Sequence, residues 1–329
     1  MSKTNIIAEV GSVHDGSFGN AIKLIELAAA LEVDAVKFQT HIPEEETLRS
    51  APSPGYFSSE NRFDYFARTG FEKYQWAELK ACADENGLAF ISSPFSQLAV
   101  EWLAEIDASC IKVASGEVTN LPMLEAISDT NLPVLLSSGM SDWQELDAAV
   151  EMLSGAELTI LQCSSAYPCP YTSVGINVIS EMRQRYGLPI GYSDHTETNY
   201  AAFAAVSLGA VCVEKHLTFS KAMYGSDASL AAEPEQFRDL VAGVRAICEI
   251  NDSMVDKSDS SEYADMKEIF QKSIVARHHI SIGDVISPDS VAYKKPGYGL
   301  SAANYKELIG KTAIVDISQD DYIQLTDVK

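Results

Sequence analysis

Two lysines and several serines occupy positions where this 329-residue sequence is otherwise apolar. Lys37 lies within AVKF and Lys112 within CIKV, and a buried ammonium group is costly unless an anion pairs with it. Either lysine alone fits a structural salt bridge. Both together, interleaved with hydroxyl groups in neighbouring apolar runs, favour a site for a phosphorylated, carboxylated ligand. The serines of this set are Ser93, Ser115, Ser138 and Ser193.

Two histidines end the last two apolar runs of this kind, GYSDH and VEKH. A single histidine is more often a packed core residue than a metal ligand. His195 and His216 end neighbouring runs beside Glu9 and Glu214, and this favours a shared divalent metal. Because only two imidazoles contribute, such a site stays open to substrate, which fits Mn²⁺, Mg²⁺ or Co²⁺ better than a closed structural zinc site.

Eight short apolar runs must position these residues, and each is followed by a segment of helical period. Eight βα units in about 245 residues predict an α/β fold of the (β/α)₈ barrel type, with its active site at the carboxyl ends of the strands. An open doubly wound sheet is the alternative, but no GxGxxG turn follows the first run. The predicted strands span 5–11, 35–40, 88–93, 110–115, 133–138, 158–164, 189–194 and 211–218.

The chain is predicted to contain two domains. The barrel is expected over residues 1–255, a polar linker over 256–265, and a small, mainly β domain over 266–329, where short apolar runs alternate with Gly, Pro and Asp turns.

Composition excludes some partners. The net charge of −23 argues against nucleic acid, because a polyanion requires a basic face, and an anionic substrate then needs a locally positive pocket. No cationic leader followed by an apolar run, and no stretch approaching the ~20 apolar residues of a membrane span, is present. The sequence therefore predicts a cytoplasmic protein with no membrane contact.

The motifs around these residues resemble the N-acetylneuraminate (sialic acid) synthase family, which includes legionaminic and pseudaminic acid synthases. The resemblance implies condensation of phosphoenolpyruvate with an N-acetylated amino sugar, either N-acetylmannosamine or a related 2,4-diacetamido sugar, to give a nonulosonic acid and phosphate. The tail, with VAYKKPGYG, resembles the antifreeze-like SAF domain of that family. The barrel motifs are AEVGSVHDG, AVKFQTH, FISSPF, IKVASGE, LLSSGM, LQCSSAYPCP, GYSDHT and VEKHLT.

The resemblance also implies roles for individual residues. Lys112, with Ser93, Ser115 and Ser193, would hold the phosphate, and Lys37 would lie near the reacting groups. The implied catalytic residues are Glu9, Lys37, Lys112 and His195, and His195 and His216 would hold a divalent metal that polarises the aldehyde. The implied substrate contacts are Gln39, Ser93, Ser115, Glu117, Ser138, Ser165, Tyr167, Ser193, Asp227 and Lys295.

Three departures from the family pattern leave the acceptor sugar open. Val13 precedes His14, Ser165 stands where Asn is common, and Lys295 replaces the usual Arg before Pro-Gly. Lysine cannot reproduce the planar fork of a guanidinium group. Tyr167 also fits an ordinary loop aromatic before proline.

Two other functions remain possible at this point. One is a class I pyruvate aldolase that uses a strand lysine such as Lys112 as a Schiff-base nucleophile, and the other is a non-catalytic sugar-binding protein. The family further implies a domain-swapped homodimer, in which Lys294 and Lys295 form a basic tip over the partner's barrel. A solvated lysine pair on a turn is the simpler interpretation of the same residues.

Overall fold

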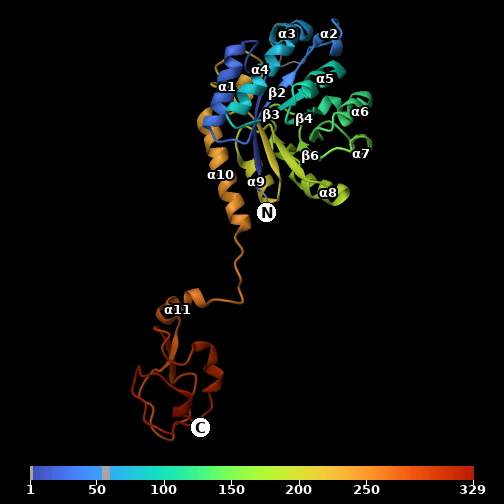
Figure 1. Cartoon of the computed structure of the whole chain (residues 1–329). Helices are drawn as coiled ribbons and strands as arrows, with labels where there is room; N and C mark the ends of the chain where they lie inside the picture. Colours follow the sequence, from blue (N-terminus) through green and yellow to red (C-terminus); the bar gives the residue numbers. More distant parts are fainter. Residues whose placement is uncertain (1–2, 54–59) are drawn as a thin grey trace. The chain divides into compact units, whose positions relative to one another are not determined.

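The computed structural model describes residues 3–53 and 60–329, and the chain divides into the compact units Met1–Ser253 and Met254–Lys329. In the first unit eight parallel strands pair in sequence order and close into a barrel, with helices around them (Figure 1). The predicted (β/α)₈ barrel is therefore confirmed, and the open sheet is wrong. The strands are β1 (Asn5–Gly11), β2 (Ala35–Thr40), β3 (Ala89–Pro94), β4 (Cys110–Val113), β5 (Val134–Ser137), β6 (Leu158–Cys163), β7 (Ile190–Asp194) and β8 (Cys212–His216).

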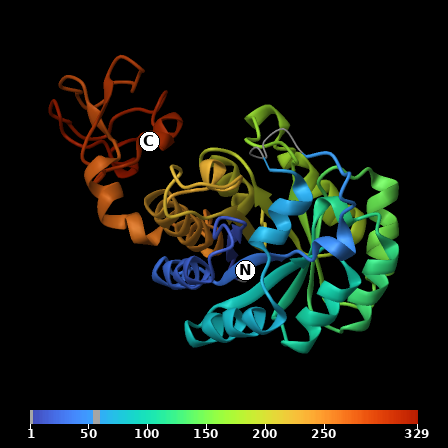
Figure 2. The same cartoon turned by 90° about the horizontal axis from the view of Figure 1, so that it is seen from above.

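The helices cover the outside of the barrel, as the view from above also shows (Figure 2). Several begin at residues whose side chains accept from the first free backbone N–H groups. Ser17 caps α1, Ser96 caps α5, and Asp142 forms a capping box with Glu145 at α7. The helices are α1 (Phe18–Ala30), α2 (Pro43–Glu46), α3 (Arg62–Thr69), α4 (Lys73–Glu85), α5 (Gln97–Glu105), α6 (Leu121–Asp129), α7 (Trp143–Met152), α8 (Ile176–Tyr186), α9 (Tyr200–Ser207) and α10 (Pro234–Asp252), with single turns η1 (Ser115–Glu117), η2 (Tyr171–Ser173) and η3 (Ala228–Leu230).

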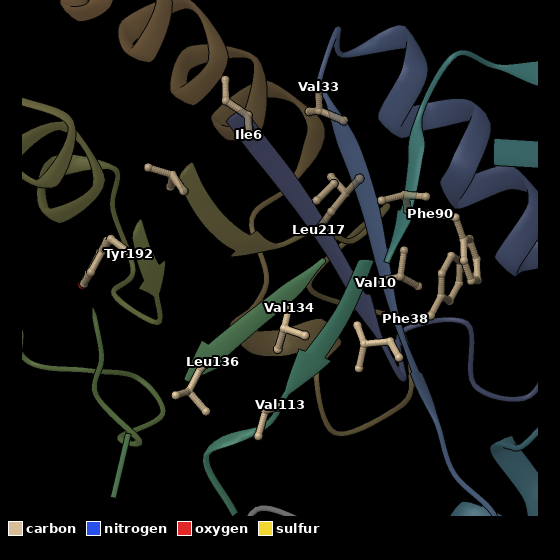
Figure 3. Packing of buried hydrophobic residues seen from close by; sticks show 14 of the residues in the cluster. Ile6, Val10, Val33, Phe38, Phe90, Val113, Val134, Leu136, Tyr192 and Leu217 are labelled. Atoms are coloured by element: carbon tan, nitrogen blue, oxygen red, sulfur yellow. The ribbon is translucent and has the colours of Figure 1, made fainter. Parts of the chain in front are cut away.

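Strand alternation sorts side chains into two cores. Side chains such as Ile6, Phe38 and Phe90 belong to the larger cluster, which packs the strands against the helices (Figure 3). Residues one position further along point into the barrel, because successive strand side chains face opposite sides. There they form a separate apolar cluster at the amino-terminal end of the strands. Its buried members are Ile7, Ala35, Ile91, Cys110, Leu135, Leu161 and Cys212.

The same period of two determines the next interior layer. On each strand that contributes to the apolar cluster, the next interior residue lies two positions further along and is polar or charged. Examples are Glu9 after Ile7 and Lys37 after Ala35. The sequence thus places an apolar floor under a polar layer, and the polar layer faces the carboxyl ends of the strands. This layer comprises Glu9, Lys37, Ser93, Lys112, Ser137, Cys163, Ser193 and Glu214.

The second unit has its own buried core, which includes Ile274, Ile286 and Ile323. It is less regular than the sequence predicted. Only β9 (Ser273–Ala276) and β10 (Val291–Lys294) form a sheet, and isolated bridges and the turns η5 (Ala302–Glu307) and η6 (Leu325–Asp327) replace the other expected strands. The predicted linker 256–265 contains the turn η4 (Ser261–Tyr263) and the first residues of α11 (Ala264–Phe270).

Within the two described ranges, no helix has both the length and the apolar character that crossing a membrane requires.

Candidate active site

A cavity of about 490 Å³ opens where the strands of the barrel end. Its lining combines side chains that follow β1, β2, β4, β6, β7 and β8, so residues far apart in sequence converge on one space. Eight of the predicted site residues line it. They are Gln39, Ser115, Glu117, Ser165, Tyr167, His195, His216 and Asp227.

Both predicted lysines lie in the polar layer, and each is paired with a carboxylate. Lys37 Nζ is 2.8 Å from Glu9 Oε2 and 3.8 Å from Glu214 Oε1. Lys112 Nζ is 2.8 Å from Glu214 Oε2. The four side chains are at most 6% exposed. This buried quartet, Glu9, Lys37, Lys112 and Glu214, therefore carries two positive and two negative charges that cancel.

The quartet stabilises its own charges. Burial alone would lower the pKa of Lys37, but Glu214 and Glu9 raise it above its ordinary value. Burial alone would raise the pKa of Glu214, yet Lys112 and Lys37 lower it to about 2. Glu214 is thus the carboxylate that contacts both ammonium groups.

Three of the four predicted serines belong to the barrel interior. Ser193 Oγ donates to Glu214 Oε1 at 3.0 Å, and Ser93 Oγ accepts from Lys37 Nζ at 3.5 Å. Ser115 Oγ is 2.8 Å from Ser137 Oγ. Ser93 thus contacts an ammonium group directly, Ser193 contacts the carboxylate that pairs with both lysines, and Ser115 contacts the interior hydroxyl of Ser137.

Ser138 lies elsewhere. Its hydroxyl donates to Gln162 Oε1 at 3.1 Å, and both residues line a second cavity of about 380 Å³. Strand alternation is the reason, because Leu135 and Ser137 face the interior and the next residue faces away. Ser137 therefore takes the interior place that the sequence analysis assigned to Ser138.

The two predicted metal ligands are neighbours, with ring centroids 5.9 Å apart. His195 Nδ1 is 2.9 Å from the Ser164 carbonyl oxygen, and a proton donated there leaves Nε2 free to ligate. His216 Nδ1 is buried and has no hydrogen-bond partner among the described residues. Such a pair could contribute two nitrogen ligands to a divalent ion. Within residues 3–53 and 60–329, no group of three or more potential ligands (His, Cys, Asp or Glu) is arranged for a metal.

The remaining predicted contacts surround these histidines. The Tyr167 ring lies 4.2 Å from the His195 ring. Asp227 Oδ2 accepts from the backbone N–H of Ser12 at 2.8 Å and from its hydroxyl at 2.9 Å. Burial alone would raise the pKa of Asp227, but His216 and these donors lower it. Asp227 is therefore an ionised acceptor in the cavity wall.

Glu117 differs from Asp227, because burial raises its pKa despite a hydrogen bond from Asn120. Gln39 Nε2 donates to Glu9 Oε1 at 2.7 Å, which connects the cavity wall to the quartet. Ser165 Oγ is buried and has no hydrogen-bond partner in the described chain. A ligand hydroxyl or amide could satisfy this atom.

Lys295 belongs to the second unit, so it is described separately. Its Nζ lies 5.1 Å from the centre of the Phe270 ring, while the neighbouring Lys294 forms an ion pair with Asp320. The side chain of Lys295 is exposed.

The pairing role of Glu214 and several residues of the cavity wall did not follow from the sequence. The sequence indicated Glu214 only as a neighbour of the histidines, not as the partner of the lysines. Lys215 follows it directly, so it lacks the apolar residue on both sides that distinguishes Lys37 and Lys112.

Arg62, Tyr65 and His41 also line the cavity. His41 is the last residue of the motif AVKFQTH, although no role was predicted for it. Arg62 and Tyr65 belong to α3, which none of the quoted motifs covers.

Comparisons with known proteins determine the family. The NeuB family matches residues 24–256, and the SAF domain matches residues 271–329. This chain belongs to the NeuB family. The resemblance found in the motifs is thereby confirmed, and the NeuB match covers most of the barrel unit that holds the cavity.

Named relatives of this NeuB-family chain include synthases of several sialic-acid-like sugars. N,N'-diacetyllegionaminic acid synthase from Campylobacter jejuni subsp. jejuni serotype O:2 is 34% identical over 334 residues, covering 98% of this chain and 100% of the relative. N-acetylneuraminate-9-phosphate synthase from Homo sapiens is 32% identical, covering 97% and 90%. The crystal structure of N-acetylneuraminic acid (sialic acid) synthetase from Leptospira borgpetersenii serovar Hardjo-bovis, in complex with citrate, superposes with a TM-score of 0.72 at 29% identity, covering 81% of this chain and 91% of that one.

The charge pairing in the quartet leads to a prediction about the free energy of unfolding. Glu214→Gln leaves two buried ammonium groups with one carboxylate, and we expect the free energy of unfolding to fall by about 3–5 kcal/mol. The control is Glu26→Gln, which removes an exposed ion pair with Lys23 and should cost less than about 1 kcal/mol. Urea unfolding followed by tryptophan fluorescence reports on the barrel, because all three tryptophans lie in the first unit. Equal losses in both variants would contradict the pairing.

Proposed function

We propose that this chain condenses phosphoenolpyruvate with the open-chain aldehyde of an N-acetylated amino sugar, giving a nonulosonic acid and phosphate. The observation that carries the proposal is the combination of buried Lys37 and Lys112, beside serine hydroxyls, with a polar cavity of about 490 Å³ at the strand ends. Ammonium and hydroxyl groups suit the phosphate and carboxylate of one substrate. The cavity above them suits a polyhydroxylated sugar.

In this proposal, residues of the chain bind and orient phosphoenolpyruvate. Lys112 with Ser93, Ser115 and Ser193 holds the phosphate, and Lys37 lies near the reacting carbons. C3 of phosphoenolpyruvate attacks the aldehyde carbon, and the aldehyde oxygen takes up a proton to become a hydroxyl group. Water then adds to the electron-poor C2. The C2–O bond to phosphate breaks as the new C2 hydroxyl loses its proton and becomes the keto carbonyl. Glu9 accepts the proton of that water, because its carboxylate is held in place by Lys37 and Gln39.

Residues around the cavity recognise the sugar. The pKa of Asp227 is lowered, so this carboxylate is suited to accept hydrogen bonds from hydroxyl groups of the sugar. The pKa of Glu117 is raised, so this carboxyl group is suited to exchange a proton. Tyr167 beside His195 offers an aromatic wall, and Ser165 offers an unpaired hydroxyl. Ser138 faces the second cavity, and we assign it an indirect role through Gln162.

His195 and His216 are the proposed ligands of a divalent metal such as Mn²⁺, Mg²⁺ or Co²⁺. When bound, the metal supplies Lewis acidity toward the aldehyde oxygen. The charges of the quartet cancel, so attraction for a multiply charged substrate needs a further positive charge at the site. We propose that a metal ion bound to the two histidines supplies this charge.

The alternative functions have less support. A Schiff-base aldolase needs a lysine in its neutral amine form, whereas Lys112 is paired with Glu214 at 2.8 Å. A non-catalytic binding protein would use the ammonium groups for an anionic ligand, but it does not account for Glu9, a carboxylate held by Lys37 and Gln39 where it can accept a proton. Borohydride reduction in the presence of pyruvate distinguishes the aldolase, which it would inactivate.

The first prediction identifies the acceptor. Incubation with phosphoenolpyruvate, Mn²⁺ and a panel of 2-acetamido and 2,4-diacetamido sugars should yield, for at least one sugar, a keto acid detected by mass spectrometry and an equal amount of phosphate. Lys112→Gln should lower kcat/KM by about 10²–10³-fold, whereas the exposed Lys23→Gln should not change it. Absence of keto acid with every sugar would refute the proposed reaction.

The second prediction concerns the metal. EDTA treatment should abolish turnover, and Mn²⁺ should restore it. His216→Ala should lose both turnover and bound metal, measured by elemental analysis after dialysis, because it removes one of the two proposed ligands. His279→Ala, in the second unit and exposed, is the matched control. Full activity of the stripped protein, or unchanged metal content in His216→Ala, would contradict the assignment.

We further propose a homodimer in which the SAF domain of one chain closes the barrel of its partner, with Lys295 at the site. Mixing two inactive variants, His195→Ala and Lys295→Ala, tests this by complementation. Swapped heterodimers contain one site with both defects and one intact site, so up to about half of heterodimer activity should return. If subunits exchange, as shown by mass-tagged chains, and no activity returns, the swap or the role of Lys295 is wrong.

A further inference from the structure

His41 lies at the end of β2, buried in the wall of the cavity. Its ring is stacked between two phenyl rings, with the Phe66 centroid 3.7 Å away and the Phe95 centroid 4.1 Å away. The interplanar angles are 16° and 13°. The stacked rings cover both faces of the imidazole, so only its two ring nitrogens are available for polar contacts.

Both nitrogens of His41 have a partner. Nδ1 is 2.8 Å from Glu46 Oε1, and Nε2 is 3.3 Å from Gln39 Oε1. Glu46 is a carboxylate side chain that is 5% exposed. An ionised carboxylate only accepts hydrogen bonds, so Nδ1 must be a donor.

The orientation of the Gln39 amide determines the second contact. Gln39 Nε2 donates to Glu9 Oε1 at 2.7 Å, and Glu9 Oε2 is 2.8 Å from Lys37 Nζ, so Glu9 is a carboxylate. A flipped amide would place its oxygen against that carboxylate, oxygen to oxygen. The amide oxygen of Gln39 therefore faces His41, and Nε2 of His41 must also be a donor.

We infer that His41 is an imidazolium ion, protonated on both nitrogens, which positions Gln39 and through it Glu9. The row of contacts runs from Glu46 through His41 and Gln39 to Glu9, with a carboxylate acceptor at each end. A neutral imidazole has one donor and cannot satisfy both contacts.

The stacked rings around His41 favour the cation, whereas its burial and the nearby positive charge of Arg62 oppose it. Both stacked rings present π faces to it, which attract positive charge. Charged groups also face this region from other elements: Arg62 at the start of α3, Glu117 on η1 and His14 after β1. Burial raises the pKa of Glu117, while Arg62 and His41 act in the opposite direction. Burial lowers the pKa of His14 to about 4, and His41 contributes to that lowering.

One competing arrangement puts the second proton on Glu46 and leaves His41 neutral. Glu46 Oε2 is buried and has no hydrogen-bond partner in the described chain, which weighs toward a neutral carboxyl group. Against it, an imidazole is intrinsically more basic than a carboxylate by about two pKa units. Measurement of protonation at each nitrogen separates the two arrangements.

The charge state of His41 is independent of the proposed function, whereas its catalytic consequence rests on it. His41 touches no reacting atom in that mechanism, so it is a positioning residue. The Gln39 amide oxygen accepts a hydrogen bond from His41, and this contact fixes the orientation of the amide. The amide N–H group therefore points at Glu9. Loss of this contact would let Gln39 rotate and would loosen the carboxylate that accepts the proton.

The test is ¹⁵N NMR of the full chain labelled at histidine, at pH 7.5, where a free imidazole is mostly neutral. The six histidines give a manageable spectrum, and His41→Gln identifies the His41 signals. We expect both nitrogens of His41 at imidazolium positions. An unprotonated Nε2, or an unprotonated Nδ1 with the proton on Glu46, would overturn the inference. This measurement uses the wild-type protein without substrate, so its result does not depend on whether the chain makes a keto acid.

A matched pair of variants tests the positioning role. Glu46→Gln removes the carboxylate, so His41 should lose its second proton and kcat should fall by up to about 10²-fold, with little change in KM. Glu45→Gln, an exposed neighbour on the same helix, should leave the spectrum and kcat unchanged. If Glu46→Gln converts His41 to the neutral form without loss of kcat, His41 does not position the catalytic carboxylate.

Discussion

The pairing of Lys37 and Lys112 with Glu9 and Glu214 inside the barrel constrains the rest of the site. Four charges that are at most 6% exposed persist only because each ammonium group contacts a carboxylate. Such an arrangement is a poor means of stabilising a core, since well-packed apolar side chains of similar size often do better. We therefore attribute the buried ammonium groups to binding of an anionic substrate rather than to stability of the barrel.

The architecture supplies this arrangement through strand alternation. Every second residue of a barrel strand faces the interior. Apolar interior residues at one height on the strands form the floor of the barrel, and the polar interior residues two positions further along form the layer that contains the quartet. The strand ends then add a wall of side chains around the cavity. His41 connects these levels, because its contact with Gln39 links the wall to Glu9 in the quartet.

Much of this site follows from the sequence, and the exceptions have physical reasons. The apolar flanks of Lys37 and Lys112 marked them as buried charges, and the count of eight βα units indicated the barrel. The period of two would also have favoured Ser137 over Ser138, had it been applied to the strand containing both. The role of His41 could not be found in this way, because it depends on Glu46 and on two stacked rings, one from α3 and one from the segment after β3.

The central claim is that the buried charges are kept for phosphoenolpyruvate rather than for stability. The double variant Lys112→Met/Glu214→Gln tests it, with Lys37 and Glu9 left as a pair. It should regain most of the unfolding free energy that Glu214→Gln alone loses, because no ammonium group remains unpaired. Equilibrium dialysis should nevertheless detect no binding of phosphoenolpyruvate in the presence of Mn²⁺. Wild-type affinity in the double variant would contradict the account.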